Sequence, residues 1–116
     1  MISTTELDQQ GSLVIAKIAT AYLTGPEMQE ITQLLMQKIR NDRATQFILD
    51  MEAVTFLSSA CIGELVTFLQ DLEHVRGRIA LVHVQPEVAF LFKVTRLDHV
   101  FPAFEDLDDA IDHVRG

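Results

Sequence analysis

The pattern of apolar and polar positions is clearest in the middle of the chain, where it changes from strand-like to helical. A short apolar run at residues 47–49 ends in Asp50, which predicts that residues 46–50 form a buried, central strand. After a turn, apolar residues recur every three or four positions from Ile62 onward, and this spacing predicts an amphipathic helix. Its expected apolar side comprises Cys61, Ile62, Leu65, Phe68, Leu69, Leu72 and Val75, and its polar side comprises Glu64, Asp71 and His74.

The N-terminal part of the chain predicts a hairpin followed by a helix. Residues 2–9 alternate weakly and are a candidate edge strand, the Gln10-Gly11 pair indicates a turn, and residues 13–18 read as a strand. Thr24 and Glu27 have the spacing of a capping box, so we expect a helix to start there and to run to about residue 40.

The C-terminal part predicts two more strand–helix units. Residues 78–84 read as a strand, and Pro86 opens a helix with an expected inner stripe of Val88, Leu91 and Val94. Residues 97–104 predict a short strand and turn, and residues 107–114 a last helix capped by Asp106.

Strands that alternate with helices require crossover connections and therefore a mainly parallel sheet. The expected fold is α/β, with a mixed, mainly parallel sheet, about four helices and the order ββαβαβαβα. The 116 residues predict a single domain spanning 1–116.

Composition and charge narrow the expected partners. The net charge of −8 argues against nucleic acid, which requires a basic surface, and against docking on anionic lipid. With one cysteine the chain can form no internal disulfide. We find neither a membrane-spanning run nor a secretory signal in the sequence, so we expect a cytoplasmic protein with no membrane insertion.

Motifs for catalysis are missing from the sequence. It contains no nucleophile elbow, no phosphate-binding loop with lysine and no His-Glu-x-x-His pair, so we expect no enzyme activity, no cofactor and no metal. The four histidines lie on different predicted elements, with His83 in mid-strand as the one expected to be buried. Cys61 is expected to be a small buried filler, and Asp50 to accept hydrogen bonds from the loop that follows it.

The segment Ile48–Gly63 carries a more specific signal: Ile-Leu-Asp-Met-Glu-Ala-Val-Thr-Phe-Leu-Ser-Ser-Ala-Cys-Ile-Gly. It resembles the signature of STAS domains, the sulfate-transporter and anti-sigma-factor-antagonist family. The family pattern is an apolar strand ending in Asp, then Val-x-Phe or Val-x-Tyr, an apolar residue, Asp-Ser, two small residues, an apolar residue and Gly. Residues 86–111 are also similar to the family's C-terminal third, where Arg96 stands at a position commonly held by Gly.

The resemblance implies a regulatory switch. In kinase-regulated members of the family, the serine at the position of Ser59 is phosphorylated by an anti-sigma factor that is also a serine kinase, and a phosphatase reverses the change. Two acids that those members carry are replaced here by Ser58 and Thr24. Ser59 is therefore the expected phosphorylation site and Ser58 the second candidate, while a simple helix cap is the alternative role of Ser59.

A second interpretation has no phosphorylation: the chain would be a STAS scaffold subunit of a signalling complex or of a transporter. In both interpretations the start of the second helix faces the partner, together with an aromatic side chain. Phe90 and Phe92 are about 200° apart on a helix, so at least one should be exposed. The expected partner-binding residues are Thr24, Ser58, Ala60, Cys61, Glu64, Phe90 and Phe92.

Overall fold

The protein is described here by a computed structural model that covers residues 5–116. The strands are β1 (Thr5–Gln10), β2 (Leu13–Ile18), β3 (Tyr22–Leu23), β4 (Gln46–Asp50), β5 (Phe56–Leu57), β6 (Arg78–Val82) and β7 (Ala103–Phe104). The helices are α1 (Gly25–Asp42), α2 (Ser59–His74), α3 (Pro86–Val94) and α4 (Leu107–Arg115). The predicted order ββαβαβαβα is confirmed, with the two short strands β3 and β5 added to it.

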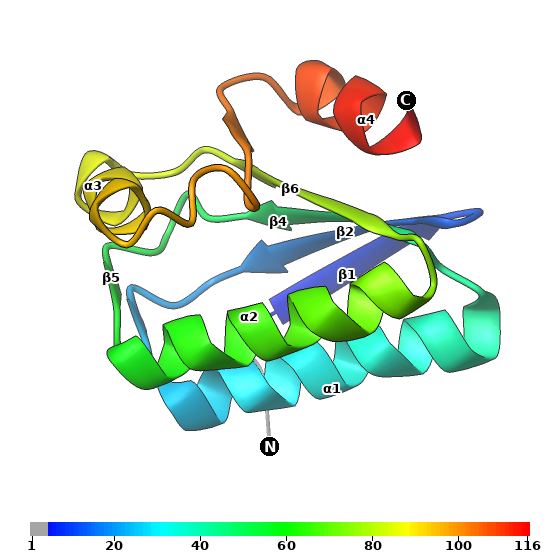
Figure 1. The fold of residues 1–116 in the computed structure, drawn as a ribbon, viewed down its shortest axis with the longest axis horizontal. Helices are drawn as coiled ribbons and strands as arrows, with labels where there is room; N and C mark the ends of the chain where they lie inside the picture. Colours follow the sequence, from blue (N-terminus) through cyan, green and yellow to red (C-terminus); the bar gives the residue numbers. More distant parts are fainter. Residues whose placement is uncertain (1–4) are drawn as a thin grey trace.

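Five strands form one sheet in the order β1-β2-β4-β6-β7. β1 is antiparallel to β2, and the other neighbours are parallel. β4 is therefore the central strand, as predicted, and β1 and β2 form the predicted hairpin. Figure 1 shows α1 and α2 along one face of this sheet, α4 on the other face and α3 beyond one end of the strands. The structure is a single α/β domain with four helices and a mixed sheet.

Alternation along the central strands divides the apolar side chains between two cores. In β4, Phe47 and Leu49 point to the core beneath α1 and α2, whereas Ile48 points to the smaller core beneath α4. Successive side chains of a strand point to opposite faces, so a strand covered on both sides must be apolar at every position. This explains the uninterrupted apolar run that identified β4 in the sequence.

The two long helices are tightly packed against each other at their first residues. A Cβ atom added to Gly25 of α1 would lie 2.7 Å from the Cβ of Ala60 in α2, well inside the ordinary carbon–carbon contact distance of about 3.5–4.0 Å. Thr24 and Glu27 form the predicted capping box just before this contact: the Glu27 N–H donates to the Thr24 hydroxyl, and the Thr24 N–H donates to the Glu27 carboxylate.

Several predicted boundaries need correction. The strand predicted over 78–84 ends at Val82, and the strand predicted within 97–104 covers only two residues. Of the predicted edge strand at 2–9, residues 2–4 lie outside the described part, and β1 continues to Gln10. Val75 and Val94, predicted to point inward, are exposed; the inner positions of α3 are Val88, Leu91 and Phe92 instead.

His83 was predicted to be buried in mid-strand, and this is wrong. Its backbone adopts a left-handed conformation with φ 57°, which a strand does not allow, so β6 ends one residue earlier. The His83 side chain is 40% exposed and lies at the carboxyl end of the sheet rather than in its core.

Candidate functional site

The two serines at the start of α2 have different positions and different roles. Ser58 is the N-cap, and its hydroxyl accepts a hydrogen bond from the Cys61 N–H at 3.1 Å. Ser59 is the first residue of the helix and is exposed. This confirms that Ser59 lies in the first turn, and it excludes Ser59 as the N-cap because Ser58 already fills that role.

The Ser59 side chain is consequently available for chemistry. Within residues 5–116, no hydrogen bond engages its hydroxyl. The N–H groups of the first helical turn have no carbonyl partner inside the helix, and the helix dipole makes this position favourable for an anion. An exposed hydroxyl at such a position can accept a phosphoryl group without losing a structural contact.

Ser58 and Thr24, where the resemblance implies acids in kinase-regulated members of the family, are both helix N-caps in this structure. Serine, threonine and aspartate all cap helices effectively, through a side-chain oxygen that accepts from a backbone N–H. Ser58 and Thr24 therefore cap both helices without placing a negative charge near Ser59.

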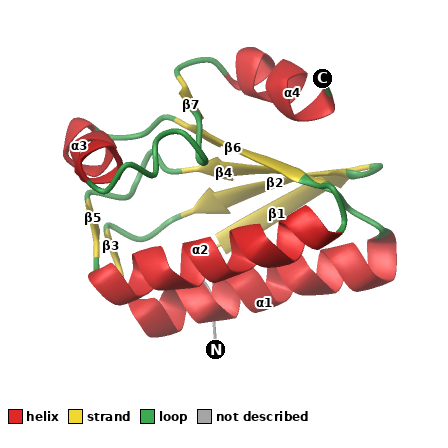
Figure 2. Cartoon of the chain, in the orientation of Figure 1, coloured by secondary structure: helices red, strands yellow, loops and turns green. Residues whose placement is uncertain are grey.

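Exposed aromatic side chains lie at the same end of the molecule as Ser59 and the starts of α1 and α2. Tyr22 of β3 and Phe56 of β5 are 55% and 51% exposed, and their rings meet edge to face with 4.9 Å between centroids. Phe90 of α3 is 66% exposed, and α3 contacts β5. Figure 2 shows β3, β5 and α3 at the end of the structure where α1 and α2 begin. Large exposed aromatic groups are typical of protein-binding surfaces.

We call Tyr22, Phe56, Ser59, Ala60 and Phe90 the helix-start surface. Tyr22 and Phe56 were not predicted, because isolated aromatic residues in a predicted loop carry no periodic signal. Each adjoins a leucine, Leu23 and Leu57, which the structure buries, and Phe56 also belongs to the signature segment.

The structure separates the predicted partner-binding residues into accessible and buried ones. Ala60 and Phe90 are exposed, whereas Thr24, Ser58 and Glu64 are half-buried. Phe92 and Cys61 are buried, so their prediction as partner contacts is wrong. Phe92 packs edge to face against Phe101 in the core, because the helix places it about 200° from the exposed Phe90.

Cys61 is the small buried filler that the sequence indicated. Burial, with lesser contributions from the Glu27 and Glu64 carboxylates, raises the pKa of the Cys61 thiol to about 12. Because the thiolate is the reactive form of cysteine, this thiol is unsuited to nucleophilic chemistry at neutral pH.

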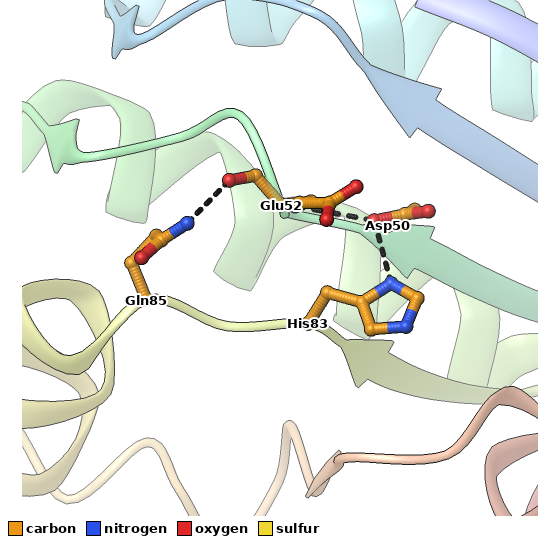
Figure 3. Close-up of polar contacts among 4 residues, drawn as sticks. All are labelled: Asp50, Glu52, His83 and Gln85. Carbon is orange, nitrogen blue, oxygen red and sulfur yellow. Dashed lines mark hydrogen bonds and ion pairs between the residues drawn. The ribbon is translucent and has the colours of Figure 1, made fainter.

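Asp50 has the loop contact predicted for it and a second contact that was not predicted. Its Oδ1 accepts a hydrogen bond from the Glu52 N–H at 3.1 Å and lies 3.1 Å from Nδ1 of His83. The Gln85 side chain donates to the Glu52 carbonyl at 2.6 Å. Figure 3 shows these four residues joining the loops that follow β4 and β6.

The fold and the segment around Ser59 are those of a STAS domain. The family model described as STAS domain matches residues 5–110, and the chain belongs to this family. Within residues 5–116, no helix is both long enough and apolar enough to cross a membrane.

Solved structures of the same fold come from regulators and from a transporter. The anti-sigma factor antagonist SpoIIAA, in its unphosphorylated form, is 24% identical, with a TM-score of 0.82 and coverage of 97% of this chain and 96% of that one. A putative anti-sigma factor antagonist from Thermotoga maritima is 19% identical, with a TM-score of 0.84 and coverage of 97% and 95%. The murine anion transporter Slc26a9 is 19% identical, with a TM-score of 0.72; the match covers 93% of this chain and 18% of the transporter. At these identities the likeness concerns the fold.

Proposed function

We propose that the chain is a regulatory, non-enzymatic protein of the anti-sigma factor antagonist type. It binds an anti-sigma factor that is also a serine kinase, and phosphorylation of Ser59 ends this binding. Three structures of the same fold support the proposal: SpoIIAA in its unphosphorylated form, Bacillus SpoIIAA in its phosphorylated form, and RsbS S58E of Moorella thermoacetica.

The observation that carries the proposal is the division of roles between Ser58 and Ser59. The Ser58 hydroxyl is engaged in capping α2, whereas the Ser59 hydroxyl is exposed at the first helical position. A kinase can reach Ser59 without opening the helix. Phosphorylation of Ser58 would remove the cap, which is typically worth about 1 kcal/mol.

The physical effect of a phosphate at Ser59 follows from its surroundings. The group adds close to two negative charges, and the helix-start surface around it includes the exposed rings of Tyr22 and Phe56. A partner that covers these rings with apolar side chains would have to desolvate the phosphate, which is costly for any unpaired charge. Phosphorylation therefore opposes complex formation, and a phosphatase restores it.

Other features of the proposal rest on the sequence. The chain acts as one domain over residues 1–116, works in the cytoplasm, and binds protein partners rather than nucleic acid. The net charge of −8 favours a partner with a basic surface.

A second function, a STAS scaffold without phosphorylation, is favoured by one observation. Thr24 and Ser58 replace the acids found in kinase-regulated members of the family, which removes charges that would help a kinase to bind. In this alternative the helix-start surface binds a component of a signalling complex or of a transporter, and the modification state of Ser59 is irrelevant.

The test compares partner binding by the wild type, Ser59→Ala and Ser59→Asp, in pull-downs from native lysate. Thr67→Asp is the matched control, because it adds the same charge to an exposed position two turns further along α2. We expect Ser59→Asp alone to lose the partner, and mass spectrometry after incubation with the captured kinase and ATP to find phosphate on Ser59. Phosphate on Ser58 alone would overturn the site assignment. If Ser59→Asp binds the partner as the wild type does, and neither Ser58 nor Ser59 is phosphorylated, the scaffold function would be favoured.

A further inference from the structure

A second group of functional side chains lies at the carboxyl ends of β4 and β6. It consists of Asp50 at the end of β4, Glu52 in the turn that follows, and His83 just after β6. One ligand atom from each of the three lies within 4.8 Å of the others. This cluster was not predictable from the sequence, because His83 is 31 positions beyond Glu52 and was predicted to lie inside a strand.

The distance between two members of the cluster matches that between two ligands of one metal ion. Nδ1 of His83 and Oδ1 of Asp50 are 3.1 Å apart. Zinc lies about 2.0–2.2 Å from imidazole nitrogen and carboxylate oxygen, so two ligands at angles between 90° and tetrahedral are about 3.0–3.5 Å apart. The pair is thus already at ligand–ligand distance, and an ion bound to both atoms would take the place of their direct contact.

The surroundings leave room for the rest of a coordination sphere. A cavity of about 420 Å³ opens beside the cluster. Its lining includes Glu52, His83 and residues around β7 such as Glu105. The carboxyl ends of parallel strands are where α/β proteins usually bind ligands. Three protein ligands with an open side are typical of zinc sites that keep a water molecule in the fourth position.

The donor set also selects the kind of ion. One imidazole and two carboxylates suit Zn²⁺ and its first-row neighbours, whereas Mg²⁺ and Ca²⁺ prefer oxygen ligands alone. Lys17 lies opposite Asp50 in the β2–β4 register, but residues 5–116 contain no ion pair between them. The two carboxylates are therefore not neutralised by that lysine.

We propose that Asp50, Glu52 and His83 form a binding site for a divalent transition-metal ion of the zinc type. The bound ion would join the loop after β4, which leads into β5, to the loop after β6, which leads into α3. These are the loops already linked by the hydrogen bond from Gln85 to the Glu52 carbonyl. The site does not include Ser59, and its existence does not depend on the function proposed above.

The test is calorimetric titration of the purified, untagged and chelator-treated chain with Zn²⁺, with the visible spectrum of bound Co²⁺ as a second readout. We expect one Zn²⁺ per chain, a higher thermal midpoint with the ion, and no comparable effect of Mg²⁺. Glu52→Gln and His83→Gln should each weaken binding by at least roughly tenfold, since even outer-shell changes cost 10–100-fold.

The control is His99→Gln, which removes an exposed histidine that is also paired with an aspartate, Asp98, at 4.0 Å. It should bind Zn²⁺ like the wild type. If His83→Gln fails to fold, Glu52→Gln decides, because the loop contacts of Glu52 are made by its backbone N–H and carbonyl rather than by its carboxylate. Absence of saturable binding at one ion per chain, or equal affinity in Glu52→Gln and the wild type, would overturn the proposal.

Discussion

The contact between Gly25 and Ala60 sets how closely the starts of α1 and α2 approach each other. In Gly25→Ala the new Cβ would lie 2.7 Å from the Cβ of Ala60, about 1 Å closer than carbon atoms ordinarily pack. Both atoms belong to short side chains fixed to helix backbones, so no rotation relieves the overlap. The two helices must separate at the end that carries Ser59.

The magnitude follows from opposing contributions. Overpacking of this kind costs about 1–3 kcal/mol, while replacing glycine by alanine stabilises by about 0.4–1 kcal/mol through the unfolded chain. The net loss in Gly25→Ala should be about 1–2 kcal/mol. Ala60→Gly relieves the overlap and by itself costs about 0.5–1 kcal/mol, so the double variant should return close to wild-type stability.

The assay is a double-mutant cycle measured by denaturant unfolding of the wild type, both single variants and the double variant. We expect a coupling free energy of about 1–3 kcal/mol in favour of the double variant, because substitutions at residues in contact do not have additive effects on stability. Two results would refute the steric reasoning: a Gly25→Ala variant more stable than the wild type, or additive effects of the two changes. Either result would mean that the first residues of α1 and α2 are further apart than in the structure.

Three further outcomes are expected from single changes. Ser58→Ala should lose about 1 kcal/mol of stability through its cap, and Ser59→Ala less than about 0.5 kcal/mol, as measured by urea unfolding. Phe92→Ala should cost about 3–5 kcal/mol, whereas Phe90→Ala should leave stability nearly unchanged and weaken partner binding. Because burial raises the pKa of Cys61 to about 12, the folded thiol stays protonated when the unfolded thiol ionises. Above about pH 9, the free energy of unfolding of the wild type should therefore decrease with pH. Its slope should exceed that of Cys61→Ala by about 1.4 kcal/mol per pH unit. Equal slopes for the two proteins would contradict this.

The fold was predictable because its central strands are buried on both faces. The run at residues 47–49 is apolar at every position since each side of β4 contacts a different core. β3 and β5 pair with each other in a separate two-stranded sheet. Each has only two residues, which is too short for any periodic signal. His83 was misplaced because the sequence does not reveal a left-handed backbone at a non-glycine residue.

The position of the two serines at the start of α2 was predictable from the sequence, but the difference in their contacts was not. The sequence placed Ser58 and Ser59 together at the beginning of α2, but only the cap geometry decides which hydroxyl is engaged. The error on Phe92 has a similar origin: helical spacing shows that Phe90 and Phe92 face different ways, yet it does not identify the inner one. The surroundings of α3 decide this, because Phe101 lies against Phe92.

The short strands explain why a charge on Ser59 should act on binding rather than on folding. The Ser58 N–H donates to the Leu23 carbonyl, and the Thr55 and Phe56 N–H groups donate to the Ala21 carbonyl, so backbone bonds between β3 and β5 hold the starts of α1 and α2 together. None of these bonds involves Ser59. A phosphate there leaves the framework intact, and its interaction with the helix dipole is worth only about 0.3–1 kcal/mol. The exposed rings of Tyr22 and Phe56 stay in place on that framework, which means that the phosphate changes the charge of the helix-start surface without changing its shape.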